Sequence, residues 1–321
     1  MVIKYNVLVL FAVFTIIWCF NAYSEERQGE WSFSSLYGAM QPSVSLIEGG
    51  LFRVPLVGSG ELKENAIGGS EEQPRSVDFR FDNYLIAAPF GGKSSFELQW
   101  HPNDKYSLLF GFGSWEKTTA SKQLVKIPSQ FVLNTVDYER RAKLTYTEFT
   151  IGGTMVFWRR PKYTFYARGS VHEVFDIDYR EDMVFSYLSD NDLLGNERVR
   201  TMQAQTAGLV MAQIGLGAEW FFQKWISVGV EAGYLKSERN VQLRDIVRKD
   251  DFVSGDNLVF SGLPYGELSD GTLGYMAVDK DGNPLKQTVI VNGEETQETV
   301  YRRMRLDFSG WQVLFRVNIY Y

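Results

Sequence analysis

The stretch WQVLFRVNIYY, residues 311–321, decides the fold. Apolar or aromatic residues occupy every odd position from Trp311 to Tyr321, while the even positions include Gln312, Arg316 and Asn318. Strict alternation predicts a β-strand with one apolar face. A strand of a soluble sandwich also alternates, but uninterrupted alternation with aromatics at both ends matches the height and aromatic girdles of a bilayer-facing strand. We therefore expect this strand to face lipid.

The same pattern recurs upstream as hairpins with very short turns. The paired segments are 96–100 with 106–112, 149–157 with 165–171, and 210–220 with 226–234, and a weaker first strand lies near 31–40. The longer connections are near 41–93, 117–142, 180–203 and 240–302. Short turns on one rim and long loops on the other are typical of outer-membrane barrels.

The fold class we predict is all-β, a transmembrane antiparallel up-and-down β-barrel of eight strands with short periplasmic turns and long extracellular loops. Ten strands are an alternative, because residues 77–86 and the segments beside 279–284 could form further strands. We favour interpreting them as β-hairpins above the membrane.

The N-terminal residues 1–24 have the form of a secretory signal peptide: Lys4, an apolar run from Val7 to Phe20, and small residues before Glu25. We expect cleavage after Ser24, export to the cell outer membrane, and a single barrel domain over 25–321. Cleavage would remove the only cysteine, Cys19, and would change the formal charge from −6 to −7 by removing Lys4. A chain of that charge is no nucleic-acid binder.

If the apolar rows face lipid, the alternate residues face the lumen. Counting from the short turns predicts one luminal layer of three carboxylates and two guanidinium groups: Glu97, Arg168, Glu219, Glu231 and Arg316. Glu148 and His172 would lie higher in the lumen. Since an unpaired buried charge costs several kcal/mol, on the order of 3–5, these groups should pair. They would form a structural plug or, alternatively, line a polar conduit.

Basic residues gather at the long-loop ends of the strands. Arginine and lysine suit phosphate, and the outer leaflet displays phosphorylated glycolipid. We therefore expect a rim that contacts lipopolysaccharide, with ordinary solvated loop charge as the alternative; the rim consists of Arg140, Arg141, Arg180, Arg239, Arg302, Arg303 and Arg305.

Enzymatic and metal chemistry find little support in the sequence. His101 stands in a Pro-Asn-Asp turn, and His172 has Ser170 two positions away on a face that should point inward, away from lipid substrates. No histidine or cysteine cluster is present, and 279–283 lacks the acidic spacing of a calcium loop. We expect no enzyme activity, no catalytic residues, no metal and no cofactor.

The hairpin spacing, segments such as WISVGVEAGY (225–234) and the aromatic C-terminus make the chain resemble the small OmpW/OmpA-like outer-membrane barrels. The resemblance implies insertion by the barrel-assembly machinery, which would recognise the last strand through residues such as Trp311, Phe315 and Tyr321. The chain has longer first and fourth loops and lacks the periplasmic domain of full-length OmpA.

Two functions follow as hypotheses. The first is a plugged barrel that serves envelope structure or surface interaction through its long loops, with outer-membrane lipid, lipopolysaccharide and an unidentified extracellular or envelope protein as partners. The second is a narrow pore or conduit for small solutes, with hydrophobic compounds among the candidates.

Overall fold

The structure is a computed structural model that describes residues 29–42, 56–63, 74–81, 86–87, 90–129, 132–189, 193–253, 259–291 and 294–321. The expected signal peptide, 1–24, lies outside these residues. Within them, no helix is long and apolar enough to span a membrane.

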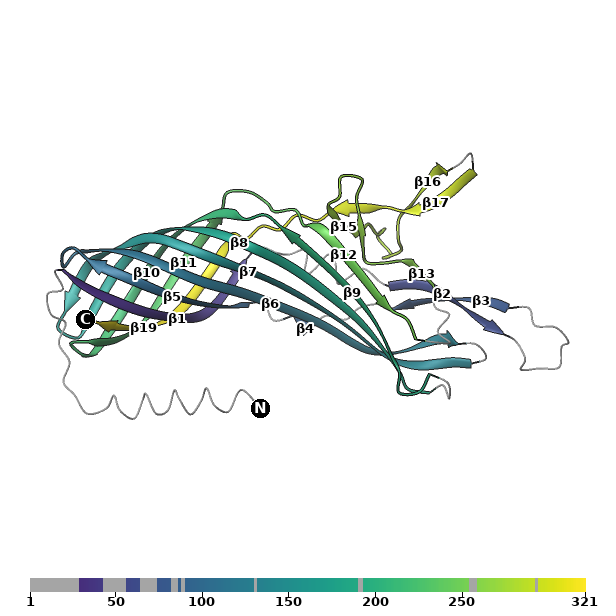
Figure 1. Cartoon of the computed structure of the whole chain (residues 1–321), viewed down its shortest axis with the longest axis horizontal. Coiled ribbons are helices and arrows are strands. Elements are labelled where there is room, and N and C mark those ends of the chain that lie inside the picture. The colour runs from purple at the N-terminus through teal and green to yellow at the C-terminus, as the bar shows by residue number, and fades with distance from the viewer. Residues whose placement is uncertain are drawn as a thin grey trace.

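Eight antiparallel strands close into a barrel in the described part of the chain, which confirms the predicted fold class and eight rather than ten strands in the ring. The ring follows the order β1, β5, β6, β7, β8, β10, β11, β19 and returns to β1. Its strands are β1 (Glu30–Pro42), β5 (Gly91–His101), β6 (Tyr106–Ser129), β7 (Val132–Arg160), β8 (Tyr163–Tyr187), β10 (Leu209–Gln223), β11 (Ile226–Ser237) and β19 (Gly310–Tyr320). Figure 1 shows this ring at the left, with the C-terminus at the end that carries the short turns.

Strands β6, β7 and β8 are two to three times as long as a bilayer-spanning strand needs to be, with 24, 29 and 25 residues. They run on to the right in Figure 1 and form an open, curved sheet. β9 (Glu197–Thr206) and β12 (Arg244–Asp251) extend that sheet, and β4 (Ile86–Ala87) pairs with β6. We call the closed ring the barrel half and this extension the outward half.

Smaller sheets belong to the outward half. One consists of β13 (Val259–Gly262), β2 (Leu56–Lys63) and β3 (Pro74–Phe81). A second contains β14 (Tyr265–Glu267), β15 (Leu273–Met276) and β18 (Tyr301–Arg303), and β16 (Lys286–Val291) pairs with β17 (Glu294–Thr299) in a hairpin that projects at the upper right of Figure 1.

These strands correct the predicted connections. Residues 117–142 and 180–203 were expected to be loops, but most of 117–142 continues the β6–β7 hairpin and much of 180–203 lies in β8 and β9. The charged residues in them alternate with buried apolar ones, for example Glu139 beside Tyr138, so the strand pattern persists with its polar face turned to solvent. Residues 77–81 belong to β3, outside the ring, in agreement with the hairpin interpretation.

The two halves have opposite faces. In the barrel half, apolar and aromatic residues point outward and are exposed, such as Phe112, Ile151 and Ile214, and polar residues point into the lumen. In the outward half, the inner face is an apolar core around Tyr138, Phe185 and Leu273. The polarity therefore inverts along continuous strands.

Candidate functional site

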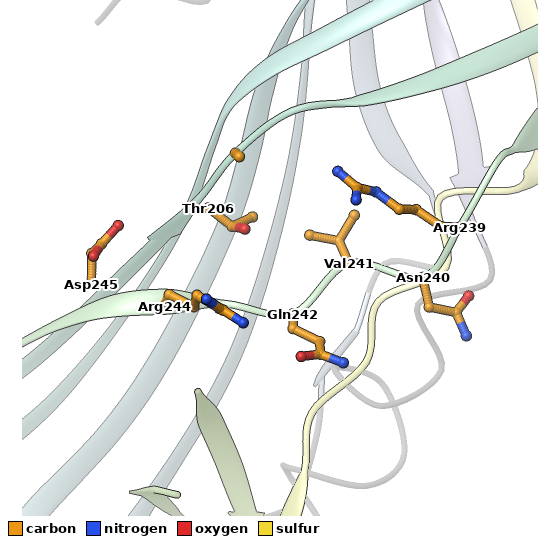
Figure 2. A pocket seen from close by; sticks show the side chains of 8 residues that line it. Thr206, Arg239, Asn240, Val241, Gln242, Arg244 and Asp245 are labelled. Atoms are coloured by element: carbon orange, nitrogen blue, oxygen red, sulfur yellow. The ribbon is translucent and has the colours of Figure 1, made fainter. Parts of the chain in front are cut away.

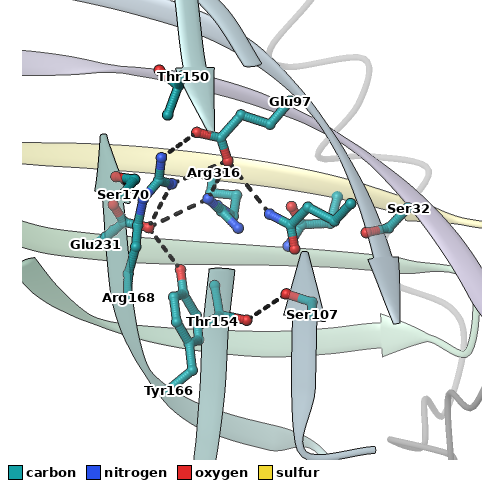
Figure 3. A network of polar contacts seen from close by, with 12 residues as sticks. Ser32, Glu97, Ser107, Thr150, Thr154, Tyr166, Arg168, Ser170, Glu231 and Arg316 are labelled. Carbon is teal, nitrogen blue, oxygen red and sulfur yellow. Dashed lines mark hydrogen bonds and ion pairs between the residues drawn. The ribbon is translucent and has the colours of Figure 1, made fainter. Parts of the chain in front are cut away.

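A network of buried ion pairs spans the lumen of the barrel half (Figure 3). Arg168 Nη2 lies 2.6 Å from Glu97 Oε1, and Arg168 Nη1 lies 3.3 Å from Glu231 Oε2. Arg316 Nη2 contacts the same two carboxylates at 2.7 and 3.3 Å. Tyr166 donates a hydrogen bond to Glu231, 3.2 Å away. Two guanidinium groups and two carboxylates thus share one site with balanced charge.

The four charged residues come from four strands of the ring, of which only β11 and β19 are neighbours. Glu97 is on β5, Arg168 on β8, Glu231 on β11 and Arg316 on β19. The two ion pairs of Arg168 and the pair of Arg316 with Glu97 therefore join strands that are not adjacent, whereas Arg316 and Glu231 pair between neighbouring strands. All four side chains are almost completely buried, and eight strands leave an interior just wide enough for side chains to fill.

Glu219 was expected within this layer, but it lies at the edge nearer the short turns. Its carboxylate accepts hydrogen bonds from the amide of Asn318 and from the Tyr320 hydroxyl, the latter at 3.0 Å. Sequence counting gave the right face but not the direction in which the side chain leans, because direction along a strand depends on the rotamer.

Glu148 and His172 lie farther along the lumen, where Lys93 joins them. Lys93 Nζ is 2.7 Å from Glu148 Oε1, and His172 Nδ1 is 3.2 Å from Glu148 Oε2. The other imidazole nitrogen, His172 Nε2, lies 3.0 Å from Ser170 Oγ and 2.8 Å from Gln213 Oε1. Lys93 was not anticipated, although its parity in β5, two steps from Ser95 and four from Glu97, would have pointed it inward.

The order Ser170, His172, Glu148 resembles a nucleophile, base and orienting acid. Their exposed fractions are 6, 2 and 1 %. Neither the wall pocket nor the vestibule described below includes any of the three in its lining. The three side chains are hydrogen-bonded or paired within the lumen.

A cluster of buried aromatic residues lies farther from the short turns than the ion pairs. The rings of Trp115 and Tyr146 stack with centroids 5.3 Å apart, and Phe308 packs edge-on against both, at 6.1 and 5.5 Å. Leu235, Met40 and Leu144 are buried in the same core. The sequence interpretation missed this layer because it considered only the charged inward positions.

On the short-turn side of the ion pairs there is a small vestibule of about 20 Å³. Gln99, His101, Glu219 and Tyr320 are among its lining residues, and it reaches Tyr166 and Arg316. Such a space holds about one water molecule.

The residues assigned to a basic rim do not form one surface. Arg140 is wrongly assigned, since it is fully buried in the outward half and binds Glu181 at 2.6 Å. Exposed Arg141, Arg180 and Arg303 pair with Glu139, Asp182 and Asp270 at 2.5, 3.0 and 2.5 Å. The remaining members, Arg239, Arg302 and Arg305, are exposed.

The residues expected to act in assembly, Trp311, Phe315 and Tyr321, all point outward, with 66, 66 and 68 % of their surface exposed. The backbone of Tyr321 also exchanges two hydrogen bonds with Trp31, at 3.0 and 3.1 Å, and so joins the last strand to the first.

The barrel wall is interrupted between β9–β10 and β11–β12 (Figure 2). The β10–β11 ladder ends at Met211 and Ser237, and the β9–β12 ladder starts at Gln205 and Arg244. Between them lies a pocket of about 700 Å³, lined by Thr206, Ala207, Arg239, Asn240, Val241, Gln242, Arg244 and Asp245. No pattern in the sequence indicates this pocket. Among the described residues, no group of three or more histidine, cysteine or acidic side chains could hold a metal ion.

Comparisons with known proteins add a likeness to solved structures. No protein-family model matches the chain, and no curated protein matches it. Among solved structures, the chain is similar to a FadL homologue from Pseudomonas aeruginosa, with 7 % sequence identity over 91 % of this chain and 90 % of the other and a TM-score of 0.18. A likeness at that score carries no conclusion about function, and the OmpW/OmpA-like resemblance has no support from these comparisons.

Proposed function

We propose that the chain is an integral outer-membrane β-barrel with a closed lumen, which serves envelope structure or surface interaction. The observation that carries this proposal is the inversion of polarity along β7. Outward residues near the short turns are apolar, as at Ile151 and Phe149, whereas outward residues farther along are charged, as at Lys143 and Arg141. An apolar outer surface on a polar interior is stable only in an apolar solvent.

The apolar band has the height of a bilayer core. On β10 it runs from Trp220 to Val210. With a rise of about 3.3 Å per residue and a tilt of about 40°, those ten steps span roughly 25 Å. Aromatic residues mark both edges, with Trp220 and Trp31 near the short turns and Tyr234 packed on Trp311 at the other edge.

Two observations favour a closed lumen. The ion pairs of Arg168 and Arg316 fill one cross-section, and the Trp115, Tyr146 and Phe308 layer fills the next. A solute would have to separate both layers. We therefore favour structural and surface roles over transport, and we propose no enzymatic activity.

The outward half supplies the surface for interaction. It has its own apolar core, and it ends in the exposed β16–β17 hairpin. We propose that a surface or envelope partner docks there, that lipid and lipopolysaccharide surround the barrel half, and that the outward face of β19 around Phe315 is recognised by the barrel-assembly machinery.

Single-channel recording tests the closed lumen. Purified full-length protein in a planar bilayer should insert without steady openings. Steady ion-conducting openings of the unaltered protein would contradict the proposal. A matched measurement of insertion by protease protection separates a closed barrel from a protein that failed to insert.

The wall interruption favours one second candidate, a conduit for small hydrophobic solutes. The pocket of about 700 Å³ is lined by Val241, which forms a β-bridge with the buried Leu306. A conduit would require the segment containing Leu306 to move. Uptake of an apolar dye into vesicles, dependent on the protein, would support this candidate over the closed barrel.

A further inference from the structure

The wall interruption is held by backbone hydrogen bonds and is not a frayed strand end. Residues 239–243 take hydrogen-bond partners inside the molecule in place of the neighbouring strand. Val241 and Leu306 exchange two backbone hydrogen bonds of 2.9 Å, and the Leu243 carbonyl accepts one of 2.8 Å from Leu273. Residues 239–243 therefore bow away from β9, because their backbone is paired with Leu306 and Leu273.

The backbone conformation of residues beside the break also indicates that the interruption is a built feature of the fold. Asp176 and Asp245 are the two non-glycine residues with positive φ in the described chain, at 50° and 48°. Asp176 lies on β8 opposite the break between β9 and β10, and Asp245 lies at the register shift of β12. Such conformations cost about 1–3 kcal/mol and cluster at functional sites. Gly208 is also required, since a Cβ there would overlap the carbonyl oxygen of Val174.

The pocket has one apolar lining residue that is itself buried. Val241 is 5 % exposed, and Leu306, its partner in a β-bridge, is completely buried. Its volume of about 700 Å³ is within the usual range for small-molecule sites, roughly 300–1,000 Å³. A ligand that enters from outside would therefore be held at the wall.

The lining carries two guanidinium groups and one carboxylate, that of Asp245, and it is rich in hydrogen-bonding groups. Arg239 and Arg244 stand at opposite ends of the bowed segment, with Val241 and Gln242 between them (Figure 2). Arg239 already donates to the Gly208 carbonyl at 3.0 Å and lies 3.6 Å from Glu238, but 62 % of its side chain is exposed. Guanidinium groups bind phosphate oxygens in a bidentate manner, and Asn240 and Thr206 can hydrogen-bond sugar hydroxyls.

The position of the pocket selects an amphipathic ligand. It lies directly above Val210, the last residue of the apolar band on β10, at about the level of lipid headgroups. Below it the outer face is apolar, with Val210 and Ile214 exposed by 40 and 73 %. A lipid with its headgroup in the pocket would lay its acyl chains on this strip.

We propose that the wall pocket binds the phosphorylated sugar headgroup of an outer-leaflet glycolipid, with Arg239 and Arg244 on the phosphate. This inference rests on the proposed membrane location. It assigns the glycolipid contact to one pocket, whereas the sequence predicted a rim of arginines. The shared chemistry is a sugar phosphate, and its source is the lipid rather than a soluble metabolite.

The test is a native mass spectrometry titration of the full-length protein in detergent with bisphosphorylated lipid A. We expect one lipid to bind, and Arg239→Gln with Arg244→Gln to weaken binding at least tenfold. Dephosphorylated lipid A should bind the unaltered protein at least tenfold more weakly than bisphosphorylated lipid A does. Arg248→Gln with Lys249→Gln on neighbouring β12 is the control, because it removes equal charge from exposed side chains paired with Glu267 and Asp251; it should change binding less than twofold.

Equal binding by the pocket variant and the unaltered protein would overturn the proposal, as would equal binding of dephosphorylated lipid A. Displacement of the lipid by equimolar glucose 1-phosphate would contradict the claim that the bound sugar phosphate belongs to a lipid. Insertion into vesicles, measured separately, identifies a failure of the proposed membrane location. A protein that inserts but lacks phosphate-dependent binding fails only in this inference.

Discussion

The barrel half and the outward half are built from the same strands with opposite faces. Along β7, the inward side changes from Thr150 and Glu148 to Tyr146 and Leu144, while the outward side changes from Ile151 and Phe149 to Lys143. β-strand geometry is unchanged across this boundary, so the backbone does not cause the inversion. The difference shows that the surroundings of each half, and not its secondary structure, dictate which face is apolar.

The two halves also hold their cores together differently. Around Tyr138, Phe185 and Phe260 the outward half stacks aromatic rings with centroids 5.0–5.4 Å apart. The barrel half brings two arginines and two carboxylates together in its lumen, whereas the described part of the outward half has the single fully buried pair of Arg140 with Glu181 beside its apolar core. Removing an apolar group leaves a cavity, whereas removing one charge leaves its partner buried and uncompensated.

The largest expected effect is the loss of one luminal cation. Arg168→Leu leaves Glu97 and Glu231 sharing only Arg316, and should destabilise the protein by about 3–5 kcal/mol. Urea unfolding in detergent micelles measures this change. The double variant Arg168→Leu with Glu97→Leu should recover part of the loss, and a single variant as stable as the original would contradict a paired layer.

A smaller effect should follow from charges placed on the outer surface. Ile214→Arg in the barrel half should cost about 2–4 kcal/mol in a bilayer. Val247→Arg in β12 of the outward half should remain within about 0.5 kcal/mol. The two residues are matched, with 73 and 63 % exposure. Similar costs for both would refute the assignment of different solvents to the two halves.

The smallest effect concerns an exposed turn of the outward half. The backbone amide of Asn283 donates to Asp279 at 2.8 Å and holds the pKa of that carboxyl below its ordinary value. A lowered pKa means that the hydrogen bonds stabilise the turn above the ordinary aspartate value, about 3.9, and are lost as the pH falls through the lower folded value. The amide shift of Asn283, followed by NMR, should titrate with a midpoint below 3.8; a midpoint above it would contradict the contact.

Period-two alternation sufficed to predict the barrel half, because lipid-facing rows such as Trp311 to Tyr321 lack any charge. The same alternation exists in β7 between Val136 and Tyr146, but the charged residues on its outward face led to the prediction of a loop. Counting parity from Glu148 would have placed Arg140 inward. Its partner Glu181 could not be found that way, because Asp176 interrupts the count in β8.

The luminal faces of Glu97, Arg168, Glu231 and Arg316 followed from the pattern, whereas their pairing depends on which strands face each other across the ring. The wall pocket could not be predicted from local sequence patterns. It exists because Val241 pairs with Leu306, which is distant in sequence, and no periodicity in 238–245 encodes that choice.

Cysteine accessibility on β7 tests the central claim most directly. Lys143 and Ile151 both point outward, and their exposures of 47 and 50 % are nearly equal. With Cys19→Ser as background, Lys143→Cys and Ile151→Cys are each reconstituted in vesicles with a charged maleimide supplied on both sides. The account predicts rapid labelling of Lys143→Cys and protection of Ile151→Cys until the protein is extracted and unfolded. Equal labelling of the two in intact vesicles would contradict a membrane around the barrel half.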